Sequence, residues 1–373
     1  MTTPACNPIG PLRLLLLLPL LLLLSTPSTS TIPTNLFTDL ERLSRIADIA
    51  YCVGNSGVRK PFRCLSHCSD FPSLSLATTW NTGMLLSDSC GYIAHDASTS
   101  SIFVVFRGTY SVTNTIVDLS SIPQPYIPYP PPTDEESQVG CENCTVHTGF
   151  YQSWQNARHL VLPELKRLRT FHPSATVHLV GHSLGGAVAC LAALELKVSL
   201  GWKDVRVTSF GEPRVGNRGM ARFIDSVFDL VQDQQVDEAR DEEGEKGEED
   251  EDRDTSYRRV THIQDPVPLL PWDEWGYSSH AGEIFISKPD LSPSEEDLRP
   301  CVGDADEECS TALLGRISPV TTHHSHHQQR ALPSLPWPPL FAHRDYFLRL
   351  GLCLPGGDPA NWAPVQEQQP DEL

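Results

Sequence analysis

The stretch ATVHLVGHSLGGAVACLAAL, residues 175–194, decides the fold of this chain. It opens with an apolar run, passes through a turn around Ser183 that is bounded by glycines, and continues as small and apolar residues with helical character. A strand that turns through G-x-S-x-G into a helix is the setting of a nucleophile elbow. The stretch therefore predicts that Ser183 is a nucleophile, with a chance match in a glycine-rich turn as the alternative.

The two outer glycines of this motif have a physical reason to be there. The turn forces the serine into a strained backbone conformation, and side chains at Gly181 and Gly185 would collide with the neighbouring helix and strand. Ser183 would then project from the carboxyl edge of the sheet, with the N–H of Leu184 available to stabilise an oxyanion. His182 stands beside the serine in sequence, so we expect it to be structural.

Further apolar segments extend this pattern on both sides. Strand-like segments cover residues 101–108, 174–180, 204–211 and 257–263, and helix-like segments cover 38–51, 152–169 and 184–199. Strands that alternate with helices predict an α/β fold with a mainly parallel central sheet and helices on both faces.

The amino terminus has the order of a secretory signal. Arg13 precedes an almost unbroken leucine run from Leu14 to Leu24, and a Ser/Thr/Pro stretch ends near Ser30. We expect a signal peptide over residues 1–30 and no transmembrane span after its cleavage, with an amino-terminal anchor as the alternative. Residues 31–373 are then expected to form a single domain.

Two segments interrupt the alternation of strands and helices. Residues 231–256 carry 13 acidic and 3 basic side chains, more than half of the formal net charge of −19, and are predicted to be a disordered acidic insertion. Residues from about 288 to 340 are rich in proline, serine and histidine and are predicted to be a low-complexity insertion. Because no basic patch balances the acidic charge, nucleic acid is not expected as a partner.

The cysteines and the termini indicate an oxidising, extracellular destination. Ten of the eleven cysteines remain when Cys6 leaves with the signal, so disulfides are expected. The sequon at Asn143 predicts glycosylation in the secretory route. The final PDEL resembles a retrieval signal of the endoplasmic reticulum, but Pro370 replaces its usual residue, so retention is only the alternative to secretion.

Several motifs together resemble one family. The stretch VHLVGHSLGGAVA, with FRGT upstream and SFGEPRVGN, RVTHIQDPVPLLP and AHRDYF downstream, is similar in order and spacing to the fungal class 3 lipases. The resemblance covers most of the chain after the signal. It implies an α/β-hydrolase fold, ester hydrolysis by a Ser/Asp/His triad and secretion.

The partners of the serine follow from chain order and from the resemblance. In this fold the acid and then the histidine follow the serine. His343, in the motif AHRDYF, is expected to be the base, with His280 as the alternative, and Asp265, two residues after a strand, is expected to be the acid. The resemblance gives the second oxyanion N–H to Thr109. A histidine run, His323, His324, His326 and His327, is read as a solvated loop, with metal binding as the alternative.

The resemblance also implies disulfides and a lid. It pairs Cys52 with Cys353, Cys64 with Cys68 and Cys141 with Cys144, and it leaves Cys301 and Cys309 to close the insertion. Cys190 is expected to be a buried free thiol, and Cys90 is left unpaired. After FRGT the family has a short amphipathic lid, in which Thr115 stands here where a tryptophan is common.

These predictions converge on a secreted carboxylic-ester hydrolase, an acylglycerol lipase that forms an acyl-enzyme at a lipid–water interface. The chemistry needs no metal and no organic cofactor. A feruloyl esterase or a phospholipase A1 on the same fold is the alternative within enzymes. A non-catalytic protein that binds lipid or a partner on a hydrolase scaffold is the alternative outside them.

Overall fold

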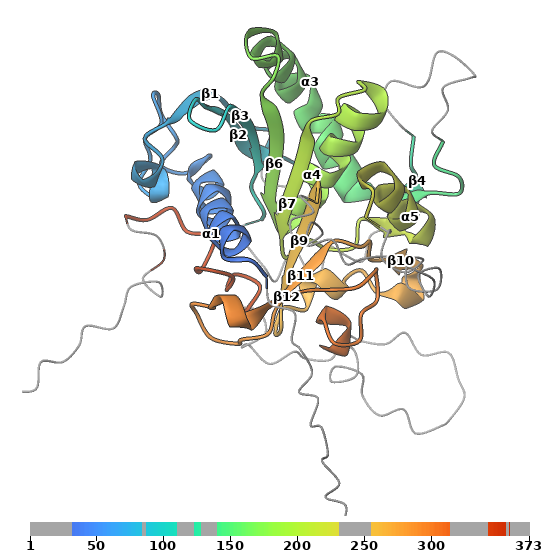
Figure 1. Cartoon of the computed structure of the whole chain (residues 1–373). Helices are drawn as coiled ribbons and strands as arrows, with labels where there is room; N and C mark the ends of the chain where they lie inside the picture. Colours follow the sequence, from blue (N-terminus) through green and yellow to red (C-terminus); the bar gives the residue numbers. More distant parts are fainter. Residues whose placement is uncertain are drawn as a thin grey trace, which may run out of the picture. The chain divides into compact units, whose positions relative to one another are not determined.

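The computed structural model of the chain is built around a sheet of eight strands (Figure 1). In spatial order they are β1 (Leu74–Asn81), β2 (Cys90–Asp96), β3 (Ser101–Phe106), β6 (Thr176–His182), β7 (Val205–Phe210), β9 (Tyr257–His262), β11 (Glu283–Ile286) and β12 (Leu298–Pro300). The five strands from β3 to β11 are parallel, while β1, β2 and β12 pair antiparallel at the two edges. The predicted mainly parallel sheet is therefore confirmed.

The structure describes most of the chain from residue 32 onward, and the statements below concern those residues. They are residues 32–83, 87–109, 123–127, 140–230, 255–313, 342–355 and 358. The predicted signal peptide, the acidic insertion up to residue 254, the segment that would hold the lid and the histidine run lie outside them.

Helices cover both faces of the sheet, as the sequence predicts (Figure 1). Helix α1 (Thr34–Ile49) packs on one face, and α3 (Thr148–Phe171), α4 (Leu184–Leu194) and α5 (Arg218–Phe228) pack on the other. Alternation along β3 shows why: Phe103 and Val105 join the cluster of α1, while Val104 and Phe106 join the cluster of the other three helices. A strand buried on both sides is expected to be apolar, and β3 is apolar and buried from Ile102 to Phe106.

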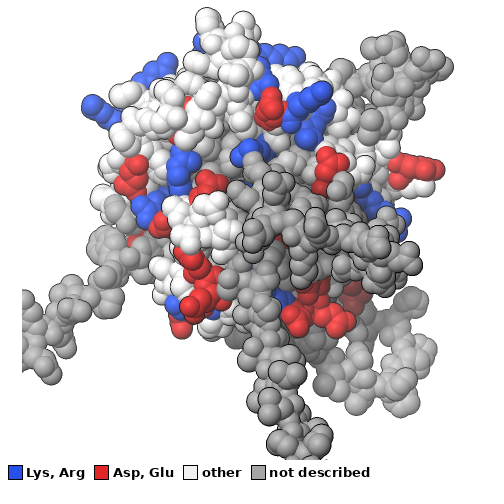
Figure 2. Space-filling view, in the orientation of Figure 1, with Lys and Arg blue, Asp and Glu red and all other residues white. Residues whose placement is uncertain are grey.

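A small second sheet borders α5. Its strands are antiparallel, in the order β10 (Tyr277–Ser278), β8 (Gly216–Asn217), β5 (Thr145–His147) and β4 (Pro123–Pro125). The Asn217 side chain caps α5 by accepting the Met220 N–H at 3.0 Å. On the face shown in Figure 2, acidic and basic side chains are interspersed.

The structure differs from the sequence prediction at the edges of the sheet. Strands β1 and β2 were not predicted, and the segment predicted as an insertion from residue 288 begins with described residues that contribute β12. Strand β12 has three residues and contains Pro300, so it lacks a strand pattern although an edge strand tolerates proline. The insertion is therefore not separate from the sheet over residues 298–300, and residues 314–340 lie outside the described part.

Candidate active site

Ser183 occupies the sharp turn between β6 and α4. Its backbone has φ 58° and ψ −131°, a conformation that non-glycine residues rarely adopt. The flanking glycines permit this turn, because a Cβ at Gly181 would lie 2.2 Å from the Gly185 carbonyl oxygen and one at Gly185 would lie 2.3 Å from that of Phe106. The geometry is that of a nucleophile elbow, with the first N–H of α4, that of Leu184, next to the serine.

His343 and Asp265 form a hydrogen-bonded pair beside this turn. His343 Nδ1 lies 2.8 Å from Asp265 Oδ2, and both side chains are buried. The other carboxylate oxygen, Oδ1, accepts the Val267 N–H at 2.9 Å. Burial opposes ionisation of Asp265, but the neighbouring His343 and the hydrogen bonds that the carboxylate accepts outweigh it and lower the pKa of Asp265. The carboxylate is therefore charged and fixes the orientation of the imidazole.

Two buried polar atoms of the site lack a hydrogen-bond partner among the described residues. They are Ser183 Oγ and His343 Nε2. Because Nδ1 of His343 is held by Asp265, Nε2 is the nitrogen left to receive a proton. Catalytic hydrogen bonds often form only when substrate is bound, so two open partners of this kind suit a serine and its base.

The segment that leads to the second predicted oxyanion donor lies against the serine. A Cβ at Gly108 would be 2.9 Å from Ser183 Cβ and 2.7 Å from the His182 carbonyl oxygen. Thr109 is the next residue in the chain and is half-buried. The predicted second oxyanion donor therefore follows a residue that packs against the elbow.

Comparison with known proteins decides the family. A family model described as lipase (class 3) matches residues 103–275. A secreted mono- and diacylglycerol lipase 2 of Gibberella zeae is 53% identical over 91% of this chain and 87% of that protein. The chain belongs to the class 3 lipase family. Lipase A of Sodiomyces alcalophilus is 52% identical over 88% of this chain and 84% of its own length.

Solved structures agree on the fold of this class 3 lipase. The Lip2 lipase of Yarrowia lipolytica superposes with a TM-score of 0.68 at 30% sequence identity, covering 87% of this chain and 98% of that one. The predicted α/β-hydrolase fold is thereby confirmed, and so is the prediction of a serine carboxylic-ester hydrolase at the level of the family.

Two tyrosines that were not predicted for this role support the site, together with His182, which was expected to be structural. The Tyr346 hydroxyl donates to Asp265 Oδ2 at 2.5 Å. On the other side, His182 Nε2 lies 2.8 Å from the His343 carbonyl oxygen, and His182 Nδ1 lies 2.5 Å from the Tyr51 hydroxyl. Burial and then the nearby His343 lower the pKa of His182 to about 3, so His182 is neutral, donates through Nε2 and accepts through Nδ1. His182 thus holds the backbone of the predicted base.

The alternative base, His280, and two further buried ionisable residues have partners elsewhere in the lipase. His280, the alternative base, contacts Glu212 Oε1 at 3.3 Å and the Ala281 carbonyl oxygen at 2.8 Å. His262 accepts the Gln264 N–H at 3.3 Å. Asp225 of α5 is buried and accepts the Ala281 N–H at 2.9 Å. None of these contacts involves Ser183.

Four disulfides join the predicted pairs, of which the resemblance implies the first three. They are Cys52–Cys353, Cys64–Cys68, Cys141–Cys144 and Cys301–Cys309. Cys90 and Cys190 are free and buried, and burial raises the pKa of each thiol. Such thiols are inert, because the thiolate is the reactive form. Among the described residues no helix has the length and apolarity needed to cross a bilayer.

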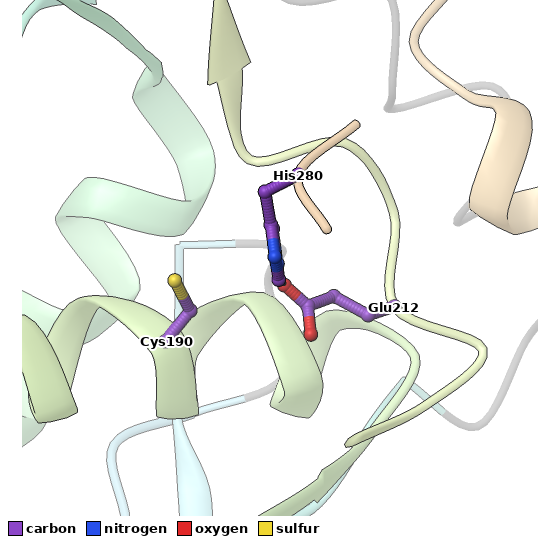
Figure 3. A group of neighbouring side chains, drawn as sticks. All are labelled: Cys190, Glu212 and His280. Carbon is purple, nitrogen blue, oxygen red and sulfur yellow. The ribbon is translucent and has the colours of Figure 1, made fainter. Parts of the chain in front are cut away.

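Two clusters of described residues contain atoms that metals prefer. One is Cys301, Asp306 and Cys309, whose cysteines form a disulfide and are thus not thiolate ligands. The other is Cys190, Glu212 and His280 (Figure 3). There the Glu212 oxygens already accept hydrogen bonds from Ser209 and Tyr257, so hydrogen bonding explains this cluster without an ion.

Proposed function

We propose that this class 3 lipase hydrolyses acylglycerols outside the cell through a covalent acyl-enzyme on Ser183. The observation that carries the proposal is the His343–Asp265 pair, in which His343 Nε2 is buried without a hydrogen-bond partner, as Ser183 Oγ also is. The substrate class comes from the relatives named mono- and diacylglycerol lipases.

Each residue then has a defined role. Ser183 Oγ attacks the ester carbonyl while His343 Nε2 takes its proton, and the charged Asp265 stabilises the resulting imidazolium. The N–H groups of Thr109 and Leu184 hold the oxyanion of the tetrahedral intermediate. His343 returns the proton to the leaving alcohol, and water attacks the acyl-enzyme by the same route to release the fatty acid.

Active-site labelling tests the nucleophile directly. A fluorescent alkylphosphonate should label the wild-type lipase at Ser183 and should not label Ser183→Ala. Equal labelling of both proteins would contradict the assignment. A protein that folds but resists the probe would support the alternative of a non-catalytic lipid-binding protein.

A comparison of substrates tests the acylglycerol assignment. Rates on monoolein, diolein, emulsified triolein, a phospholipid and methyl ferulate should be highest on the acylglycerols. Turnover of methyl ferulate alone would indicate a feruloyl esterase, and preference for the phospholipid would indicate a phospholipase A1.

We also propose that the lipase is glycosylated at Asn143 during secretion. Asn143 is exposed and has a φ of 56° in the tight loop that the Cys141–Cys144 disulfide closes. Treatment with an N-glycosidase should reduce the mass of the secreted wild type and leave Asn143→Gln unchanged.

Secretion itself is supported by the four disulfides and by the name of the Gibberella zeae relative, and it is tested by finding the protein in culture medium.

A further inference from the structure

A buried carboxylate lies behind the elbow and has no place in the chemistry above. Glu212 follows β7 by two residues and is 1% exposed. Its two oxygens accept hydrogen bonds from the Ser209 hydroxyl and, at 3.0 and 2.9 Å, from the Tyr257 hydroxyl. Figure 3 shows the His280 ring meeting the same carboxylate, with Cys190 of α4 beside them. Side chains from β7, β9, α4 and the segment after β10 therefore surround this carboxylate.

Hydrogen bonds favour the charged form of the buried Glu212 carboxylate. His280 Nδ1 faces the Ala281 carbonyl oxygen and His280 Nε2 faces Glu212 Oε1, and both of these oxygens only accept. Burial opposes the charge on Glu212, but the contacts with His280 and Ser209 outweigh it and lower the pKa of Glu212. Moving this buried charge away from its hydrogen-bond partners would strongly destabilise the folded state.

The hydrogen bond between Ser209 and Glu212 closes a turn whose inner residues touch both halves of the active site. The Phe210 carbonyl oxygen accepts the Ser183 N–H at 2.8 Å. Gly211 has a φ of 60°, and a Cβ there would lie 2.9 Å from both Asp265 Oδ2 and His343 Cε1. One closed turn thus sets the position of the serine backbone and of the His343–Asp265 pair.

The same turn also supports the start of α4. A Cβ at Gly186 would lie 3.0 Å from Ser209 Cβ and 3.1 Å from Glu212 Cβ, so both side chains pack directly on the first turn of this helix. That turn carries the N–H of Leu184. Movement of Glu212 would therefore displace the nucleophile, its base and an oxyanion donor together.

We propose that Glu212 is a positioning residue for ester hydrolysis, holding Ser183 in register with His343 and Asp265 through the Ser209–Glu212 turn. The inference rests on the proposed function, because it assigns a role to Glu212 only if Ser183 is the nucleophile. Glu212 does not touch the substrate, so its loss should change the turnover of bound substrate more than the binding of substrate.

Glu212→Gln tests the proposal, because it keeps the size of the side chain and removes its charge. On a soluble 4-nitrophenyl butyrate we expect kcat to fall about 10- to 100-fold, the scale of small misplacements in an active site. KM should stay within about twofold. Phosphonate labelling of Ser183 should slow in parallel. An unchanged kcat in folded Glu212→Gln would overturn the proposal.

Glu195→Gln is the matched control. Glu195 is also a buried carboxylate on the α4 segment, but it lies beyond the other end of the helix and binds Arg158 and the Trp154 indole at 2.7 and 2.8 Å. Because the role of Glu195 is structural only, Glu195→Gln should lower the melting temperature and leave kcat unchanged. Equal loss of kcat in the two variants at a temperature where both are folded would also overturn the proposal.

A second variant covers the case in which Glu212→Gln does not fold. Ser209→Ala removes the donor that closes the turn and no charge, and it should reproduce the fall in kcat in a smaller form, whereas an unchanged kcat would contradict the inference. Wild type and Ser183→Ala are measured alongside. If the wild type showed no hydrolysis that depends on Ser183, the proposed function would fail, and that result is distinct from an active wild type with an equally active Glu212→Gln.

Discussion

The Tyr346 hydroxyl donates to Asp265 Oδ2, the same oxygen that faces His343 Nδ1. Both partners of this oxygen come from the motif AHRDYF, in which the two residues stand three positions apart. A single short turn therefore supplies both the predicted base and a donor that stabilises the charged state of the predicted acid.

Tyr346→Phe removes this donor and leaves the ring in place. A hydrogen bond to a charged group contributes about 1.5–3 kcal/mol, so the free energy of unfolding at pH 7 should fall by about that amount. The contact with Tyr346 lowers the pKa of Asp265 in the folded state, and the resulting stabilisation is present above the unfolded pKa of about 3.9 and is lost as the pH falls through the folded value. Urea unfolding at pH 7 and pH 3 should therefore show a smaller difference in the variant than in the wild type. An equal difference would contradict this role of Tyr346.

Thr109→Pro tests the second oxyanion donor, because proline lacks the N–H. Loss of one such donor costs about 3 kcal/mol of transition-state stabilisation, so kcat should fall roughly 100- to 1,000-fold with little change in KM. Thr109→Ala is the control, since it keeps the N–H and removes only the hydroxyl. If both variants lost the same activity, the hydroxyl rather than the N–H would be the donor.

The elbow could be predicted from the sequence because its constraints are local. Gly181, Ser183 and Gly185 lie within five residues, and the strand and helix around them have clear apolar patterns. Chain order and the resemblance then indicated Asp265 and His343. The supporting residues could not be found in this way. Tyr51 contacts His182 across 131 positions of sequence, and nothing near a tyrosine in a helical segment indicates so distant a partner.

Glu212 shows the same limit at the level of charge. Its position in SFGEPRVGN indicates only a turn after a strand, and an acidic residue in a turn is ordinarily solvated. The side chain is buried because Tyr257 and His280, which follow it at 45 and 68 positions, supply donors from the next strand and from the connection to β11. Strands β1 and β12 were missed for a related reason, since edge strands are short or half-exposed and lack a continuous apolar pattern.

The disulfide Cys52–Cys353 joins residues 301 positions apart and ties the end of α1 to the carboxyl-terminal segment. A link across so long a loop restricts the unfolded chain strongly, so the double variant Cys52→Ser/Cys353→Ser should lose about 5–6 kcal/mol of stability in the chain-entropy model. Cys141 and Cys144 are separated by 3 positions, and their double replacement should cost less. Chemical unfolding of both double variants checks the order, and equal losses would contradict it.

Stability below neutral pH should depend on two buried histidines, His178 and His182. Burial, with a contribution from nearby basic groups, lowers the pKa of each to about 3, whereas an unfolded histidine titrates near 6.5. Between these values the unfolded chain binds protons that the folded chain excludes, so the free energy of unfolding should fall as the pH falls, by about 1.4 kcal/mol per pH unit for each histidine. Urea unfolding at pH 7.5, 6 and 5 measures this slope. The His178 ring forms a hydrogen bond of 3.0 Å with the Thr208 hydroxyl and takes no part in the proposed chemistry. The His178→Gln variant should therefore keep the hydrolytic activity, and its stability should depend less steeply on pH because one titrating histidine is gone. A slope equal to that of the wild type would show that His178 is not its source.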